Sequence, residues 1–210
     1  MREEPNHLRA FAIIPAAGES RRMGEPKLLL PLQSKPLIAH TIDAWLTAGL
    51  KPLVVVRPND EALAQVCRER GADVVKPQAP PSEMKVSVQL ALQFLDGQFH
   101  PGEHDCWLIA PADMPRLSVA IIGRLLQLHC ESVASHSTSI LVPTIAGKHG
   151  HPVLFPWPLS AQVHHLGTNE GVKALLTRNP VREIPCDDLL AQGPQAFADI
   201  DTPADYQRFK

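Results

Sequence analysis

Apolar and polar residues follow two distinct patterns along the chain. Short runs rich in apolar and β-branched residues are typical of buried strands, and they occur from Phe11 onward and over Pro52–Arg57, Ala72–Lys76, Asp105–Ala110 and Ser139–Ile145. The segments between them carry helix start and stop signals, over Leu37–Leu46, Glu61–Arg70, Lys85–Leu95 and Ser118–Leu128. Strands that alternate with helices are typical of a parallel sheet covered by helices. The pattern therefore predicts an α/β fold, a three-layer α/β/α Rossmann-like arrangement with a mostly parallel mixed sheet.

Capping residues place several helix boundaries. The pair Asn59-Asp60 supplies N-cap candidates for the second helix, and Gly71 is suited to end it. Near the C-terminus we expect a short strand from Phe197 that leads into a helix, with Thr202 as its N-cap and Pro203 at its first position.

Composition narrows the class of protein. The 210 residues are 44% apolar with a formal charge of −2, which fits a single domain over residues 1–210 with a sizeable core. The small net charge argues against a nucleic-acid partner, and no apolar run reaches the roughly 20 residues that a membrane span needs. The cysteines are scattered without a Cys-x-x-Cys pair, as in a reducing compartment. We expect a cytoplasmic protein without nucleic-acid or membrane partners, a monomer or a weak homo-oligomer.

The first strand runs into a small-residue, cationic loop, with Gly18, Ser20, Arg21, Arg22, Gly24 and Lys27 within ten positions. Backbone N–H groups approach an anion most easily where side chains are small, and the cations neutralise charge, so this loop suits a polyphosphate. Neither the Walker A pattern nor the dinucleotide Gly-x-Gly-x-x-Gly pattern is present. A basic surface turn is the alternative.

The segment Ala-Ala-Gly-x-Ser-x-Arg-Met-Gly-x-Pro-Lys over residues 16–27 resembles the signature loop of the nucleotidyltransferases related to the molybdenum cofactor guanylyl- and cytidylyltransferases. In that family the loop wraps the triphosphate of an NTP. The resemblance implies a nucleotidyltransferase fold and catalytic roles for Lys27, Arg22 and Asp113. It also implies a nucleotide-binding set made of Ala16, Ala17, Gly18, Ser20, Arg21, Arg22, Gly24, Lys27 and Ser87.

Two aspartates are candidate metal ligands. Asp113 follows the strand Asp105–Ala110, and a carboxylate that faces a triphosphate needs a divalent cation between them, for which Mg²⁺ is the usual ion. Asp113-Met-Pro also looks like the Asp-x-Pro of the family, where the Asp binds metal. The resemblance implies Asp201 as the second ligand, with Asp199 as the fallback. The alternatives are a turn or helix-capping role for Asp113 and a plain capping cluster at Asp199–Asp205.

The remaining candidates lie on loops. Ser87 belongs to a segment similar to the Met-x-x-Ser-Leu loop of the family, near base and sugar, although it could equally cap the helix. Gly150, His151 and Gly171 match family segments on the acceptor side. His151 could bind an acceptor phosphate or serve only as a turn imidazole. Lys173 stands where the family has Arg. Lysine cannot make the bidentate phosphate contact that arginine makes, so the identity of the acceptor is in doubt.

The expected chemistry is nucleotidyl transfer, in which an acceptor phosphate oxygen attacks the α-phosphorus of an NTP and pyrophosphate leaves. Because Ala16-Ala17-Gly18 is the form usual in the resembling cytidylyltransferases, the sequence favours CTP, with Mg²⁺ as cofactor and a molybdopterin-like phosphorylated acceptor. Other phosphorylated acceptors, such as sugar phosphates, are the first alternative. A catalytically silent nucleotide-binding module is the second.

Overall fold

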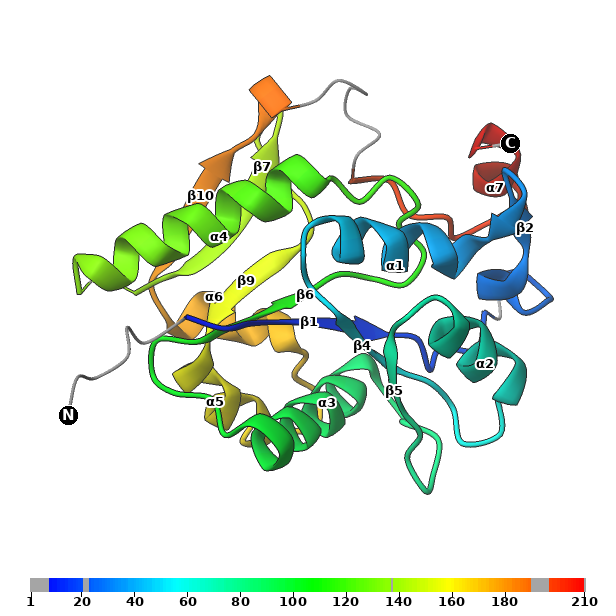
Figure 1. Ribbon diagram of the computed structural model, residues 1–210, viewed down its shortest axis with the longest axis horizontal. Coiled ribbons are helices and arrows are strands. Elements are labelled where there is room, and N and C mark those ends of the chain that lie inside the picture. The colour runs from blue at the N-terminus through cyan, green and yellow to red at the C-terminus, as the bar shows by residue number, and fades with distance from the viewer. Residues whose placement is uncertain (1–7, 21–22, 137, 190–196, 210) are drawn as a thin grey trace.

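A mixed β-sheet forms the centre of the molecule (Figure 1). The computed structural model describes residues 8–20, 23–136, 138–189 and 197–209. Within them the main sheet has eight strands: β1 (Ala10–Pro15), β4 (Pro52–Val55), β5 (Asp73–Val75), β6 (Cys106–Ile109), β7 (Ile140–Ile145), β8 (Lys148–His149), β9 (Val153–Pro156) and β10 (Val181–Pro185). Their order is β10-β7-β9-β6-β1-β4-β5, with β8 paired to β7. Because only the β6–β9, β7–β9 and β7–β8 pairs are antiparallel, the predicted mostly parallel mixed sheet is confirmed.

Helices cover both faces of the sheet. They are α1 (Leu37–Thr47), α2 (Glu61–Glu69), α3 (Met84–Phe99), α4 (Val119–Ala134), α5 (Ser160–His164), α6 (Leu175–Arg178) and α7 (Pro203–Phe209). Apolar residues of α1, α2 and α4 share one core with Ala12 and Ile14 of β1, whereas those of α3, α5 and α6 share a second core with Ile13. Successive strand residues point to opposite faces, so one strand serves both layers. This is the predicted three-layer arrangement. Within the described ranges no helix combines the length and apolar composition that crossing a lipid bilayer requires.

The residues that the sequence suggests as helix caps lie at the ends of α2 and α4 in the structure. The Asp60 carboxylate accepts a hydrogen bond from Leu63 N at 3.2 Å at the start of α2, and Gly71 follows this helix with a φ of +87°. The hydroxyl of Ser118 accepts from Ile121 N at 3.4 Å and caps α4. Helices α3 and α4 continue past the expected ends, to Phe99 and Ala134. Near these ends the Phe99 ring lies 5.6 Å from the Phe11 ring, and the buried His129 contacts the His104 carbonyl at 3.0 Å.

The predicted short strand from Phe197 is wrong, since residues 197–202 make no strand pairing. Instead this segment crosses the edge of the sheet, where Ile200 N donates to the carbonyl of Asp113 at 3.1 Å. The helix that follows is α7, capped by Thr202 and Asp205: the Thr202 amide and hydroxyl both donate to the Asp205 carboxylate, at 2.9 and 2.7 Å. The hydrogen bond with Thr202 lowers the pKa of Asp205. A two-residue strand, β2 (Pro31–Leu32), lies beside α7 (Figure 1), and the Tyr206 hydroxyl donates to its Pro31 carbonyl.

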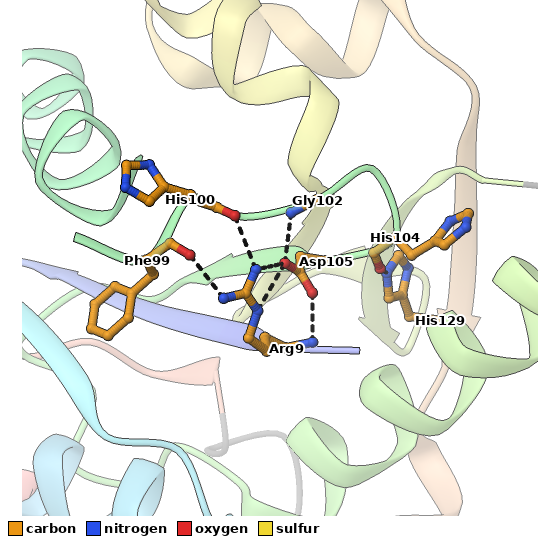
Figure 2. Close-up of polar contacts among 7 residues, drawn as sticks. All are labelled: Arg9, Phe99, His100, Gly102, His104, Asp105 and His129. Carbon is orange, nitrogen blue, oxygen red and sulfur yellow. Dashed lines mark hydrogen bonds and ion pairs between the residues drawn. The ribbon is translucent and has the colours of Figure 1, made fainter. Parts of the chain in front are cut away.

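A buried aspartate fastens β1 to β6 at their amino ends (Figure 2). Asp105 is 5% exposed, and its carboxylate accepts from the Arg9 amide at 2.7 Å, from the Arg9 guanidinium at 2.7 and 3.1 Å, and from Gly102 N at 2.8 Å. The same guanidinium donates to the carbonyls of Phe99 and His100, at 2.8 and 3.1 Å. This cluster lies at the amino ends of β1 and β6, whereas the loop at Gly18 follows the carboxyl end of β1. It joins the C-terminal end of α3 to both strands.

Replacing Asp105 with alanine is expected to lower the free energy of unfolding by about 2–3 kcal/mol, because it removes the shared acceptor of four part-buried hydrogen bonds, two of them from the Arg9 guanidinium. Urea denaturation measures this change. The control is Lys51→Ala, which removes an exposed pair with Asp73 and should cost less than about 1 kcal/mol. A loss as small as that of the control would contradict the structural role of Asp105.

Candidate functional site

The site lies at the carboxyl ends of β1, β4 and β6. In open α/β sheets this edge, where chain connections depart to opposite faces, is the usual place for a ligand. A cavity of about 660 Å³ opens there. It is lined by the sequence-predicted residues Ala16, Ala17, Gly18, Ser20, Lys27, Ser87, Asp113 and Asp201, and also by Pro15, Glu19, Leu28, Arg57, Pro80, Pro81, Ser82, Glu83, Met84, Pro111 and Ala112.

One lysine joins the two predicted metal ligands. The Lys27 ammonium lies 2.5 Å from Asp113 Oδ2 and 3.3 Å from Asp201 Oδ1. Three segments far apart in the sequence supply these side chains: a single 3₁₀ turn (Lys27–Leu29), the loop after β6, and the segment before α7. The side chains of Lys27 and Asp113 are only 10% and 16% exposed, so the charges interact in a partly desolvated setting. The structure thus brings together the three residues on which the sequence hypothesis depends.

The chemistry of this pair of carboxylates suits a divalent cation. The described part of the chain contains no group of three or more His, Cys, Asp or Glu side chains placed to hold a metal ion by themselves. However, Asp113 and Asp201 already converge on one cationic group, the Lys27 ammonium. Mg²⁺ is usually bound by one or two carboxylates together with substrate phosphates rather than by an all-protein cage. The residues present therefore fit a metal that arrives with a triphosphate.

Asp199 and His151 border this centre. Burial raises the pKa of Asp199, and the nearby charges of Asp113 and Asp201 raise it further. Burial lowers the pKa of His151, against the opposing effects of its contact with the Ile109 carbonyl at 3.4 Å and of Asp199 and Asp113. His151 therefore presents a neutral imidazole beside a group of carboxylates.

The structure shows which residues cap the two helices beside Asp201 and Ser87. The segment before α7 is capped by Thr202 and Asp205, which leaves Asp201 to face Lys27. Helix α3 begins at Met84 with Glu83 as its N-cap residue, so Ser87 lies inside the first turn. Ser87 is 2% exposed and is among the residues that line the cavity.

The loop after β1 has the conformation of a close-approach turn. It is anchored where Ala16 N donates to Val55 O at 2.8 Å. Ser20 and Gly24 have φ angles of +49° and +72°, in the left-handed region that few residues other than glycine adopt readily. Gly24 lines a second cavity of about 310 Å³, together with Gly18 and Ser20, which also line the first. The predicted contacts of Arg21 and Arg22 lie outside the described residues.

The three acceptor-side candidates are not among the described residues that line the 660 Å³ cavity. A Cβ on Gly150 would lie 2.1–2.2 Å from ring atoms of Phe197, so the close approach that Gly150 permits is to this ring and not to open space. Gly171 is exposed. Its loop is tied to α3 by Lys85, whose ammonium donates to the carbonyls of Gly167 and Thr168 at 2.6 and 2.8 Å.

Sequence reasoning missed Arg57 as a site residue. It follows the carboxyl end of β4 and lines both cavities, and its Nε donates to the Ala17 carbonyl at 3.1 Å. The signal was present, because a charged residue directly after a buried strand is the same feature that pointed to Asp113.

Comparison with known proteins identifies the family. A model of the MobA-like NTP transferase domain matches residues 12–183. The purine catabolism protein PucB of Bacillus subtilis (strain 168) is 29% identical over 201 residues, which are 91% of each chain. The 3-deoxy-manno-octulosonate cytidylyltransferase of Zea mays is 33% identical over 133 residues, which are 63% of this chain and 43% of that protein. The chain thus spans less than half of this second relative.

Solved structures share the fold. Rv0371c from Mycobacterium tuberculosis H37Rv superposes with a TM-score of 0.74 at 25% identity, over 96% of this chain and 97% of that one. A crystal structure of Rv0371c in complex with manganese superposes with a TM-score of 0.72 at 24% identity, over 96% and 98% of the two chains. Both likenesses extend over nearly the whole length of the two chains compared.

Proposed function

This chain belongs to the family of MobA-like NTP transferase domains, and from that premise we propose that it transfers a cytidylyl group from CTP to a phosphorylated small-molecule acceptor. The observation that carries the proposal is the meeting of Lys27, Asp113 and Asp201 at the wall of a 660 Å³ cavity. A lysine beside paired carboxylates fits a metal-bound triphosphate, since the carboxylates suit the metal and the ammonium suits the phosphates.

In the proposed reaction an oxygen of the acceptor phosphate forms a bond to the α-phosphorus of CTP. The bond from the α-phosphorus to the bridging oxygen breaks, and pyrophosphate leaves with the electron pair. Mg²⁺ held by Asp113 and Asp201 would supply Lewis-acid stabilisation of the phosphoryl oxygens. Lys27 stabilises charge that grows on the α- and β-phosphates, and the amide of Gly18 and the hydroxyl of Ser20 donate to the phosphates. In this proposal Arg22 binds the β- and γ-phosphates, and Arg21 assists it.

Two kinds of observation support CTP. Ala16 and Ala17 line the cavity, and a methyl group at these positions leaves less room for a purine than the hydrogen of a glycine would. The relative from Zea mays is named a cytidylyltransferase. For the acceptor, the family match and the loop over residues 16–27 support a molybdopterin-like phosphate. Because Lys173 stands where the family has Arg, a sugar phosphate or an isoprenoid-precursor phosphate is the competing acceptor.

The proposal is tested by measuring pyrophosphate release with each of the four NTPs, Mg²⁺ and a panel of phosphorylated acceptors. We expect release with CTP and molybdopterin, and none when the acceptor is omitted. Binding to the folded state alone raises apparent stability, by about 2.7 kcal/mol at a hundredfold excess over Kd, so CTP with Mg²⁺ should also raise the melting temperature. Absence of pyrophosphate release with every pair, and of stabilisation by every NTP, would remove the proposal. Pyrophosphate release with a different acceptor would change only the proposed acceptor, molybdopterin, and would leave the proposed transfer reaction in place.

A further inference from the structure

Arg57 is held in the site with part of its guanidinium unused. Its Nε donates to the Ala17 carbonyl at 3.1 Å, which fixes the side chain against the loop after β1. Among the described residues, no protein group accepts a hydrogen bond from its two terminal nitrogens, and Arg57 lines both cavities. A planar guanidinium whose Nε is anchored holds its remaining donors in a nearly fixed direction. The side chain is thus preorganised for a ligand.

The strand order separates Arg57 from the phosphate-binding centre. Asp113 follows β6 and Arg57 follows β4, and β1 lies between these strands. Neighbouring strands are about 4.8 Å apart, so the two strand ends are separated by roughly 10 Å. This separation is comparable to the span of one nucleoside. A nucleotide whose α-phosphate binds beside Lys27 and which extends across β1 toward β4 places its base near Arg57.

The surroundings of Arg57 suit a base better than a phosphate. On the β5 side of the larger cavity, Pro80, Pro81 and Met84 offer apolar surfaces that can stack on a planar ring. The carboxylates of Glu25 and Asp60 line the smaller cavity and not the larger one, so they favour a triphosphate in the larger cavity, where Gly18, Ser20 and Lys27 lie.

We propose that Arg57 reads the nucleotide base and selects bases that present two adjacent hydrogen-bond acceptors on one edge, an inference that rests on the proposed function. Cytosine presents N3 and O2, and guanine presents N7 and O6. Adenine alternates acceptors with its amino donor, and uracil carries the N3–H donor between its two carbonyls, so neither offers such a pair. Arg57 therefore separates cytosine and guanine from adenine and uracil. The methyl groups of Ala16 and Ala17 then favour the smaller ring.

The test is calorimetric binding of CTP, UTP, GTP and ATP with Mg²⁺ to the full chain and to Arg57→Ala and Arg57→Lys. A good bidentate contact to a base discriminates by about 1–3 kcal/mol, or on the order of 5- to 150-fold, so the wild type should prefer CTP over UTP by a ratio in this range. In both variants the ratio should fall below about threefold, because lysine keeps the charge but lacks the planar fork. The loss should lie in CTP binding, with UTP binding little changed. CMP and UMP should show the same contrast, because the difference lies in the base.

The control is Arg68→Ala, which removes an exposed arginine paired with Glu61 on α2 and should leave every affinity unchanged. If both Arg57 variants weaken all four NTPs equally, or if the wild type binds all four equally, Arg57 does not read the base and this inference is overturned while the transferase proposal stands. If the wild type prefers GTP over ATP and the variants lose that preference, base reading stands and only the preference for cytosine fails. If the wild type binds no NTP, the transferase proposal and this inference both fail.

Discussion

Replacing Asp113 with asparagine is expected to lower the rate of nucleotidyl transfer by about 10³- to 10⁴-fold, with a much smaller loss in CTP binding. The amide is nearly isosteric with the carboxylate, so the loop after β6 and its contact with Ile200 N are retained. The change removes one of two negative charges that converge on a single cation position. That position is where charge develops during transfer, whereas much of the nucleotide contacts the rest of the cavity. Steady-state pyrophosphate release and calorimetric CTP binding measure the two effects separately.

Asp188→Asn is the matched control for this prediction, because Asp188 forms an exposed ion pair with Arg124. It should leave transfer and binding unchanged. Transfer by Asp113→Asn at more than about a tenth of the wild-type rate would contradict a metal-ligand role for Asp113. If wild type and variant bind CTP and are equally inert with every acceptor, the protein is a nucleotide-binding module and not a transferase.

Replacing Lys27 with methionine should have two opposite effects. Transfer should fall by about 10²- to 10³-fold, as expected for the loss of one positioned donor to developing phosphate charge. In the absence of nucleotide, however, Mn²⁺ should bind about tenfold more tightly or better, because the competing ammonium no longer occupies the place between Asp113 and Asp201. Titration of Mn²⁺ followed by electron paramagnetic resonance measures the free ion directly.

The physical reason lies in the double role of Lys27. Without a nucleotide its ammonium neutralises the two carboxylates, and with a triphosphate present it has phosphate oxygens as alternative partners. The wild type should therefore bind Mn²⁺ more tightly with CTP than without it, and Lys27→Met should show less of this coupling. Lys51→Met, on the exposed pair with Asp73, is the control. Weaker Mn²⁺ binding by Lys27→Met in the absence of nucleotide would contradict the competition.

The elements that sequence reasoning predicted well are those defined by local signals. The strand β4 and the helix α2 lie within the ranges expected from apolar periodicity, Asp60 and Gly71. Strand β1 likewise runs into the loop at Gly18 as the pattern predicts. These signals depend on a few neighbouring residues, so they predict an element correctly even when the rest of the fold is unknown.

The elements that were missed depend on distant contacts. The segment after Phe197 has the local pattern of a strand, yet it pairs with no strand because Ile200 N bonds to the Asp113 carbonyl across the edge of the sheet. The same kind of contact decides the environment of Gly150, which faces the ring of Phe197. Periodicity describes which side of an element is apolar, but not which distant segment covers it.

By itself the sequence determined the class of fold, the cationic loop after the first strand and the aspartates that follow apolar segments, since strand and helix periods, turn residues and charge are properties of neighbouring positions. Only the tertiary structure decided that Lys27 and Asp201, 174 positions apart, share an ion pair. It also decided that Thr202 and Asp205 take the capping role, so that Asp201 faces the cavity, and that Arg57 extends from the neighbouring strand into the same cavity. These placements depend on the order of strands in the sheet and on how the last segment crosses its edge, which no local pattern encodes.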